Sequence, residues 1–243
     1  MEVITSISNN KIKNLAKLNQ KKYRDEEGKF LVEGFHLVEE AYKSGYLLEV
    51  LKTEDCECKF NLPVTNVTYE IIKKLSSTQA PQKIIGVVKK INEKSLGNRI
   101  LIIDELQDPG NLGTIIRSSV AFNIDTIILS ENSVDLYNDK VIRASEGMLF
   151  KINILKKNIK EVIGSLKSND YKIFGTKVTN GTDLKNVICP EKFAFIVGNE
   201  GNGIRKEILD LCDEYLYIPM NEKCESLNVA IATSIILYEI GDQ

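Results

Sequence analysis

The second half of the chain alternates short apolar runs with stretches whose apolar side chains recur at helical spacing. The apolar runs are rich in β-branched and aromatic residues without alternating polar ones, which is typical of parallel strands covered on both faces. These runs lie at 100–103, 126–129, 172–174, 193–197 and 215–218. The helical stretches lie at 112–122, 159–168, 204–211 and 227–240. This order predicts an α/β domain with a mostly parallel sheet.

The first part of the chain follows a different pattern. Residues 30–43 place apolar side chains at helical spacing from Phe35 to Tyr42, with Gly34 near the start of the stretch, and β-type runs lie at 48–52 and 84–89. These features predict a small mixed α/β domain, and the polar stretch NEKSLGN that follows it is typical of a linker. We therefore expect three parts, with boundaries at 1–91, 92–98 (the linker) and 99–243.

Length and composition exclude several classes of protein. A chain of 243 residues can bury a core without disulfides or a metal, and its longest nearly apolar stretch, 229–238, is too short to span a membrane. The start of the chain has no apolar segment behind a basic one, so secretion is not expected. Five cysteines in no disulfide-like spacing and a single histidine, His36, predict a cytoplasmic protein without a metal site.

Residues 9–24 carry six basic side chains and no acidic one. Such a run predicts a basic helix, or a helix followed by a loop, that offers cations to phosphates. The alternative is a solvated helix face without a ligand. The candidate phosphate contacts are Lys11, Lys13, Lys21, Lys22 and Arg24.

Ligands of parallel sheets bind at the loops that follow the strands, and three such loops stand out, at 108–117, 198–203 and 218–228. The second is rich in glycine, which lets a backbone approach a ligand closely. Its Glu200 would repel a diphosphate, and its spacing is neither the dinucleotide fingerprint nor a Walker loop. The loop therefore favours an adenosine ligand with a cationic or neutral tail, such as S-adenosylmethionine. An ordinary glycine turn before a helix is the alternative.

The first loop leads into an apolar helix that contains one cation, Arg117. At 3.6 residues per turn, Arg117 shares its face with Gly113, Thr114 and Ala121, which leaves the guanidinium room to reach a phosphate or a carboxylate. Pairing with a structural acid is the alternative. Asn111, at the start of the same helix, is expected to lie close to a ligand bound at the carboxyl end of the strand at 100–103.

Together the three loops resemble the motifs of the SpoU (TrmH) family of the SPOUT superfamily, which are S-adenosylmethionine-dependent RNA 2′-O-ribose methyltransferases with a trefoil-knotted fold. The first motif is similar to Asn111, Gly113 and Arg117, and the second to Gly198, Asn199, Glu200, Gly201 and Gly203. The third is similar to Ile218, Pro219, Met220, Glu225, Ser226, Leu227 and Asn228, and a further block to Arg143, Ser145 and Gly147. The stretch from Asn10 to Glu33, with KKYR and FLVEG, resembles the family's ribosomal-protein-like substrate-binding domain.

The resemblance implies a cofactor, a set of site residues and a partner. S-adenosylmethionine would be held by Thr176, Gly198, Asn199, Gly203, Ile218, Met220 and Leu227, largely through backbone groups. The residues implied in catalysis are Asn111, Arg117, Glu200, Ser226 and Asn228. Relatives are dimers in which the arginine of the first motif works beside the partner's cofactor, so we expect a homodimer formed by the methyltransferase domain.

The sequence does not decide whether Arg117 removes the proton of the ribose hydroxyl or positions the RNA phosphate. Arginine is effectively always protonated, so positioning a phosphate is an easier task for it than removing the proton of a ribose hydroxyl. Glu200, Ser226 and Asn228 could orient that hydroxyl or pass on its proton.

The expected substrate is rRNA, with large-subunit 23S-type RNA favoured, because a separate basic front domain suits a large structured RNA. The alternatives are a tRNA methyltransferase, a non-catalytic RNA-binding or ribosome-assembly protein on the same fold, and a doubly wound enzyme with a nucleotide cofactor.

Overall fold

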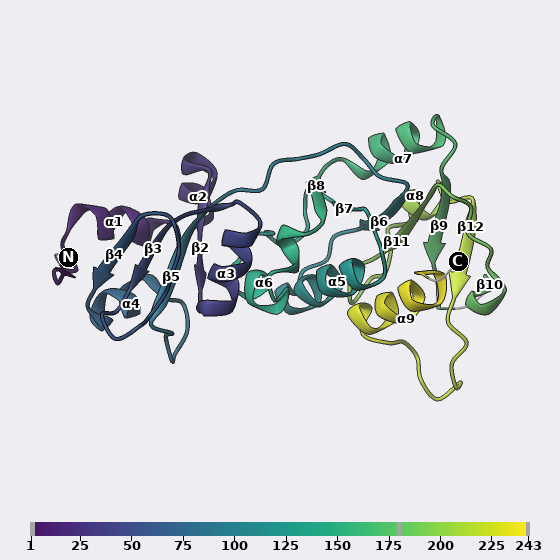
Figure 1. The fold of residues 1–243 in the computed structure, drawn as a ribbon. Helices are drawn as coiled ribbons and strands as arrows, with labels where there is room; N and C mark the ends of the chain where they lie inside the picture. Colours follow the sequence, from purple (N-terminus) through teal and green to yellow (C-terminus); the bar gives the residue numbers. More distant parts are fainter. Residues whose placement is uncertain (1–2, 179–180, 242–243) are drawn as a thin grey trace. The chain divides into compact units, whose positions relative to one another are not determined.

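The computed structural model describes residues 3–178 and 181–241 and divides into two compact units (Figure 1). The first unit comprises Met1–Asn92 together with Asp135–Phe150, and the second comprises Glu93–Val134 and Lys151–Gln243. The segment Asp135–Phe150 therefore packs with the first unit, although its place in the chain lies inside the expected range 99–243.

The sheet of the first unit has five strands in the order β1-β4-β3-β5-β2. Strand β5 pairs antiparallel with β2 and β3, whereas β3, β4 and β1 pair in parallel. The strands are β1 (Val3–Ile4), β2 (Lys29–Glu33), β3 (Leu47–Lys52), β4 (Val64–Val67) and β5 (Ile84–Lys89). The strands expected at 48–52 and 84–89 are thus confirmed. Strand β2 was missed because its five residues run directly into a helix with only Gly34 between them.

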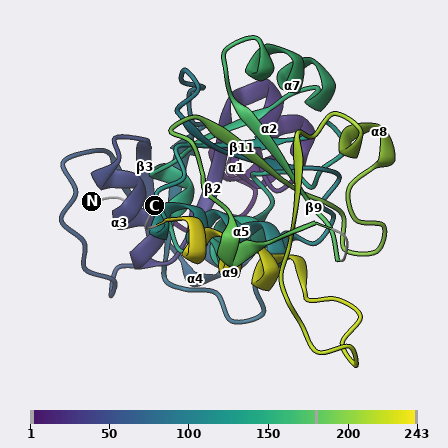
Figure 2. The same cartoon turned by 90° about the vertical axis from the view of Figure 1, so that its right-hand side faces the viewer.

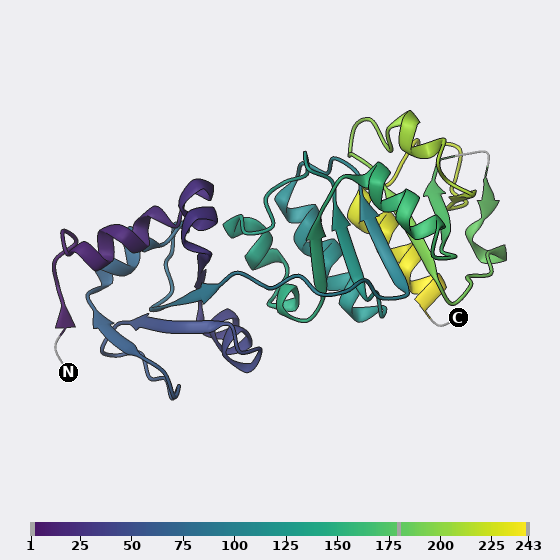
Figure 3. The ribbon, with the colours of Figure 1, turned by 90° about the horizontal axis from the view of Figure 1, so that it is seen from above.

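The helices of this unit are α1 (Asn10–Lys17), α2 (Lys21–Glu27), α3 (Phe35–Lys43) and α4 (Tyr69–Leu75). The basic run forms α1 and α2, as expected of a helical basic segment, and α3 begins after Gly34 at φ 98°, a backbone conformation that favours glycine. Figure 3 shows helices along one face of the sheet of this unit, where α1 and α4 bury Ile12, Ile71 and Ile72.

The segment Asp135–Phe150 contains α6 (Asp139–Ala144) and a short 3₁₀ turn (Met148–Phe150). Its apolar side chains complete the core of the first unit. The Tyr137 ring lies 4.7 Å from that of Phe30, centroid to centroid, and the Phe150 ring lies 5.9 Å from that of Tyr46. Burial raises the pKa of Tyr137 to about 12, and its hydroxyl accepts a 3.0 Å hydrogen bond from the Ile91 N–H. This packing was not expected from the sequence.

The second unit is built on a seven-stranded sheet in the order β10-β12-β9-β11-β6-β7-β8, in which every neighbouring pair is parallel. The strands are β6 (Arg99–Ile103), β7 (Thr126–Leu129), β8 (Asn153–Lys156), β9 (Lys172–Thr176), β10 (Thr182–Asp183), β11 (Phe193–Val197) and β12 (Glu214–Tyr217). All five expected strands and the parallel sheet are confirmed. Strand β8 was missed because its two apolar residues lie between Asn153 and Lys156, and β10 because both of its residues are polar.

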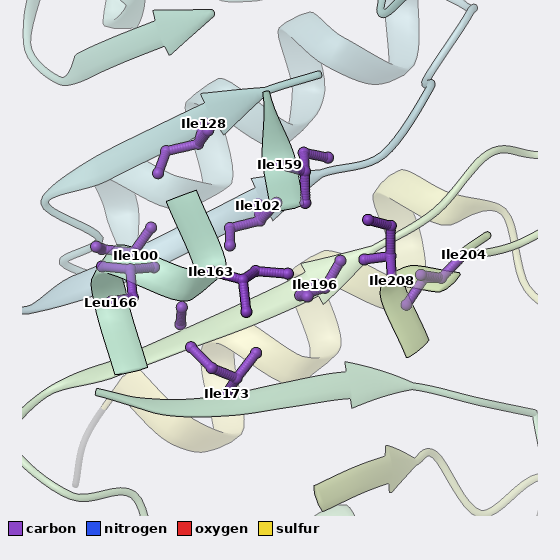
Figure 4. Close-up of a cluster of buried hydrophobic side chains, with 11 residues drawn as sticks. Ile100, Ile102, Ile128, Ile159, Ile163, Leu166, Ile173, Ile196, Ile204 and Ile208 are labelled. Atoms are coloured by element: carbon purple, nitrogen blue, oxygen red, sulfur yellow. The ribbon is translucent and has the colours of Figure 1, made fainter. Parts of the chain in front are cut away.

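Helices cover both faces of this sheet. Those expected from the sequence appear as α5 (Pro109–Ala121), α7 (Ile159–Lys167), α8 (Lys206–Leu209) and α9 (Val229–Gly241). Figure 4 shows Ile159, Ile163 and Ile208 of α7 and α8 packed on the isoleucines of the strands. Helices α5 and α9 lie together on the opposite face, joined by a 2.7 Å contact between the Ser118 and Ser234 hydroxyls (Figure 2). The trefoil knot stays a prediction.

No helix within residues 3–178 and 181–241 is both long and apolar enough to cross a membrane. Over the same residues, no group of three or more His, Cys, Asp or Glu side chains is placed to hold a metal ion.

Candidate active site

A cavity of about 620 Å³ opens at the carboxyl ends of β9, β11 and β12 and beside the start of α9. Its volume falls within the range of about 300–1,000 Å³ that is usual for small-molecule sites. All seven residues expected to hold the cofactor line it: Thr176, Gly198, Asn199, Gly203, Ile218, Met220 and Leu227. Glu200, Ser226 and Asn228 line it as well, whereas Asn111 and Arg117 do not.

The second loop is closed on itself by backbone hydrogen bonds. The Asn199 N–H donates to the Gly203 carbonyl at 2.9 Å, and the Gly203 N–H donates back to the Asn199 carbonyl at 3.0 Å. The Asn199 side-chain oxygen accepts from the N–H of Gly201 at 2.9 Å, inside the turn. Gly203 has φ 67°, and a Cβ on Gly198 would lie 2.1 Å from the Gly203 carbonyl carbon. The glycines are therefore needed for the turn and for close packing of the backbone.

Glu200 joins the second loop to the first. Its Oε1 accepts from the Asp108 N–H at 3.0 Å and from Asn111 Nδ2 at 3.1 Å, and its Oε2 accepts from the Gln107 N–H at 3.3 Å. Burial opposes ionisation, but these hydrogen bonds outweigh it and hold the pKa of Glu200 below its usual value. The carboxylate is thus charged at neutral pH and a weaker base than an ordinary glutamate, which favours orienting over proton transfer.

Asn111 and Asn228 connect the first loop to the third. Asp108 caps the start of α5 by accepting from the Asn111 N–H at 2.8 Å, which fixes Asn111 in the first turn. Asn228 Nδ2 donates to Asn111 Oδ1 at 3.0 Å, while Asn228 Oδ1 accepts from the Ala230 N–H at 2.9 Å at the start of α9. Glu200, Asn111 and Asn228 therefore form one hydrogen-bonded chain across the three loops.

An ion pair between a fully buried carboxylate and a partly exposed arginine, beside the site, was missed by the sequence reasoning. The Asp104 side chain is fully buried at the end of β6 and accepts from three donors of Arg205, namely the backbone N–H at 3.0 Å, Nε at 3.0 Å and Nη2 at 2.7 Å. Asn199 Nδ2 adds a bond to the Glu105 carbonyl at 2.9 Å. The signal in the sequence was an aspartate directly after an apolar run, but its partner lies 101 positions away.

Arg117 lies on the exposed face of α5 with Thr114 and Ala121, outside the cavity of its own chain. Within the part of the chain that the structure describes, no carboxylate or other group pairs with its guanidinium. The structural acid considered as an alternative partner is thus not found there, and the guanidinium is available to a ligand.

The five candidate phosphate contacts lie in different surroundings. The four lysines are exposed on α1 and α2, but the Lys11 ammonium forms an ion pair with Glu49 and that of Lys22 lies 3.9 Å from the Glu26 carboxylate. The expectation that Arg24 contacts phosphates is wrong. Its guanidinium is buried, donates to the Leu18 carbonyl at 2.9 Å and pairs with Asp135 at 2.6 Å, so it holds the segment Asp135–Phe150 rather than facing solvent.

Comparison with known proteins decides the family. The model of the SpoU rRNA Methylase family matches residues 98–238, more than half of the chain. The chain belongs to the SpoU family. The model of the MRM3-like substrate binding domain matches residues 9–86 of this SpoU protein. The family predicted from the three motifs, and the S-adenosylmethionine that its members use, are thereby confirmed.

Relatives match the SpoU protein over nearly its whole length. It is 37% identical, over 99% of both chains, to 23S rRNA (guanosine(2553)-2′-O)-methyltransferase RlmP of Bacillus subtilis (strain 168). A putative TrmH-family RNA methyltransferase of Porphyromonas gingivalis superposes with a TM-score of 0.87 at 30% identity, covering 96% of this chain and 98% of the other. An AdoMet-bound rRNA methyltransferase of Sinorhizobium meliloti gives 0.86 at 27% identity, covering 98% and 96%.

Proposed function

We propose that this protein transfers the methyl group of S-adenosylmethionine to a ribose 2′-hydroxyl of 23S-type rRNA in the cytoplasm. The observation that carries the proposal is the hydrogen-bonded chain of Glu200, Asn111 and Asn228 at the edge of a cavity of suitable volume. The 37% identity to a 23S rRNA 2′-O-methyltransferase supports the choice of RNA and of the ribose oxygen. Five cysteines in no disulfide-like spacing fit a reducing compartment.

The cavity fits the cofactor in size and in chemistry. Its wall includes Ile204, Ile218, Leu227 and Ile236, which suit an adenine ring, and backbone groups of the second and third loops supply polar contacts. Lys177 and Glu200 are the charged side chains of the wall, so the cavity has no cluster of cations for a diphosphate. We therefore assign Gly198, Ile218 and Leu227 to cofactor binding.

The bound cofactor supplies an electrophilic methyl group on a sulfonium. In the transfer, the ribose 2′-oxygen forms a bond to the methyl carbon, the carbon–sulfur bond breaks, and the hydroxyl proton leaves. We assign Arg117 to fixing the neighbouring RNA phosphate, because its charged guanidinium is a poor base. Ser226 and Asn228 lie where the third loop enters the cavity, and we assign them to orienting the hydroxyl for in-line attack.

The direct test incubates the purified protein with labelled S-adenosylmethionine and with separated 23S rRNA, 16S rRNA and tRNA. We expect label at one position of 23S rRNA, mapped by the resistance of the adjacent phosphodiester to alkaline cleavage. Label in tRNA alone would support the tRNA enzyme instead. Intact cofactor binding without label in any naked RNA or in precursor ribosomal particles would support the non-catalytic alternative.

An Arg117→Ala variant should lose single-turnover methylation by about two orders of magnitude, because the RNA phosphate that aligns the 2′-hydroxyl with the methyl group is no longer fixed. Because Arg117 is assigned to the RNA phosphate and not to the cofactor, and does not line the cavity of its own chain, the dissociation constant of S-adenosylhomocysteine should stay unchanged in calorimetry. Near-wild-type turnover in this variant would remove Arg117 from the proposed site.

The first unit is the proposed RNA-binding part, in line with its match to a substrate binding domain. Replacing Lys13 and Lys21 together by glutamine should flatten the dependence of log K on log salt for RNA binding by about one per lysine. Lys11→Gln is the matched control, because its ammonium is already paired with Glu49 and bonded to the Thr65 hydroxyl at 3.0 Å. An equal change of slope in both variants would contradict this assignment.

We also propose that two copies associate through α9. This helix exposes Ile231, Ile235 and Tyr238, by 54%, 38% and 62%, and it packs beside α5, which carries Arg117. A second copy that covers this apolar face would bring Arg117 to the partner's cavity. Ile231→Asp should yield monomers in light scattering and abolish methylation, whereas Ile7→Asp, at a similarly exposed position of the first unit, should change neither.

A further inference from the structure

Helix α6, in the segment Asp135–Phe150, carries two basic side chains for which the proposed function has no role. Lys140 is exposed, and no partner for its ammonium occurs within the described parts of the chain. The Arg143 side chain is 37% exposed, and its Nη1 donates to Asp139 at 2.7 Å and to the Ser77 hydroxyl at 3.1 Å.

The contacts of Arg143 hold its guanidinium in place but occupy only the Nη1 donor. Ser77 also donates to Asp139, at 2.7 Å, so that the serine, the aspartate and the arginine form a closed triangle. Burial opposes the charge of Asp139, but the hydrogen bonds from Ser77 and Arg143 keep its pKa below the usual value, so the triangle persists at neutral pH. Nε and Nη2 of Arg143 remain as donors in a fixed orientation, which is the arrangement that favours a phosphate.

Other cations lie around the same place. Asn19, Leu75, Ser77, Asp139 and Arg143 all line one small cavity of about 30 Å³ in the first unit, so these five residues are neighbours in space. Exposed lysines also lie within three positions of this set along the chain, among them Lys21, Lys22 and Lys74. Lys140 and Arg143 therefore share this part of the first unit with lysines near the start of α2 and the end of α4, and Glu33 and Asp139 are the carboxylates that line the same cavity.

The chain that enters the segment is tied to the site loop. Just before Asp135, the Val134 N–H donates to the Leu106 carbonyl at 2.9 Å, and the Asn132 carbonyl accepts from Gln107 Nε2 at 3.0 Å. Because β7 and β11 each pair in parallel with β6, residues 130–134, which follow β7, leave the sheet at the same edge as the loops of Asn111 and Glu200. The two bonds thus hold the residues before the segment to Leu106 and Gln107, within the second unit.

From these contacts we propose that Lys140 and Arg143 bind backbone phosphates of the substrate RNA, so that residues 135–150 form part of the RNA-binding surface. The proposal rests on the proposed function and extends it to a segment that the SpoU methylase match, 98–238, encloses. Phosphate contacts position an RNA without reading its sequence, so this surface adds affinity rather than base selectivity.

The test measures binding of a 23S rRNA transcript by the full-length protein between 50 and about 300 mM KCl. Lys140→Gln and Arg143→Gln should each flatten the dependence of log K on log salt by about one, and Arg143→Lys, which keeps the charge, should retain most of the slope. Lys160→Gln on α7 is the matched control, because it removes a charge that is paired with Glu207 at 3.4 Å in the second unit. Binding of S-adenosylhomocysteine should be unchanged in all four variants.

The outcomes separate this inference from the proposed function. If the wild-type protein methylates 23S rRNA but Lys140→Gln keeps its full salt slope, the inference is overturned and the proposed function stands. If Arg143→Gln lowers the melting temperature of the first unit, Lys140→Gln decides alone, since its ammonium has no partner to lose within the described residues. A wild-type protein that binds no RNA overturns both proposals.

Discussion

A Gly198→Ala variant should lose binding of S-adenosylmethionine by at least about 100-fold. A Cβ at this position would lie 2.1 Å from the carbonyl carbon of Gly203 and 2.2 Å from the backbone nitrogen of Ile204. Both contacts involve backbone atoms, so no side-chain rotation relieves them. The second loop would have to open, breaking the reciprocal bonds between Asn199 and Gly203 and moving the wall of the cavity. A loss of about 2.7 kcal/mol corresponds to this factor of 100.

Gly201→Ala is the matched control for this prediction, because it adds the same methyl group to the same loop. The nearest atom to a Cβ on Gly201 is the Asn199 side-chain oxygen at 3.6 Å, an ordinary contact distance. Calorimetry with S-adenosylhomocysteine should therefore give near-wild-type affinity for Gly201→Ala and none measurable for Gly198→Ala. Equal affinities in the two variants would show that the loop tolerates the movement, and the crowding argument would be wrong.

Removing the guanidinium of Arg205 should lower the free energy of unfolding of the second unit by about 3–5 kcal/mol. Asp104 is fully buried, and Arg205→Met would leave its carboxylate with the backbone N–H of residue 205 as the remaining donor of that residue. An unpaired buried charge costs far more than the loss of an exposed ion pair. Urea unfolding followed by circular dichroism measures the difference.

Two further variants test the cause of this loss. In the double variant Asp104→Asn with Arg205→Met no charge is left buried, so it should be more stable than Arg205→Met alone. Lys167→Gln removes an ion pair with Asp213 whose partners are 39% and 37% exposed, and it should cost no more than about 1 kcal/mol. A double variant no more stable than the single one would mean that lost packing, and not the stranded charge, causes the destabilisation.

The regular elements of the second unit could be predicted because each carries its own local signal. The strand at 193–197 is a continuous apolar run of five buried residues, and the helix at 159–167 repeats apolar side chains at 3.6-residue spacing. The expected cofactor residues line the cavity for the same reason, since Gly198 and Ile218 sit in loops directly after such strands. Local patterns of this kind survive into the fold because a parallel sheet buries its strands on both faces.

Pairings over long distances could not be predicted in this way. Arg24 looked like its lysine neighbours in the sequence, but it turns inward because Asp135, 111 positions later, lies beside it. Asp104 and Arg205 likewise give no sign of each other in a single sequence. A charge run shows where cations are frequent, but only the tertiary contacts decide which of them are buried, and the same holds for the packing of Tyr137 on Phe30.

The placement of Asp135–Phe150 in the first unit has a consequence for synthesis of the chain. When residue 92 leaves the ribosome, Phe30 and Tyr46 still lack the aromatic rings that cover them, because Tyr137 and Phe150 have not been made. At about 5–20 residues per second, the wait from residue 92 to residue 150 is roughly 3–12 seconds. During this interval the nascent amino-terminal part has an incomplete core. The residues that complete it are made only after part of the second unit, including β7, has been translated.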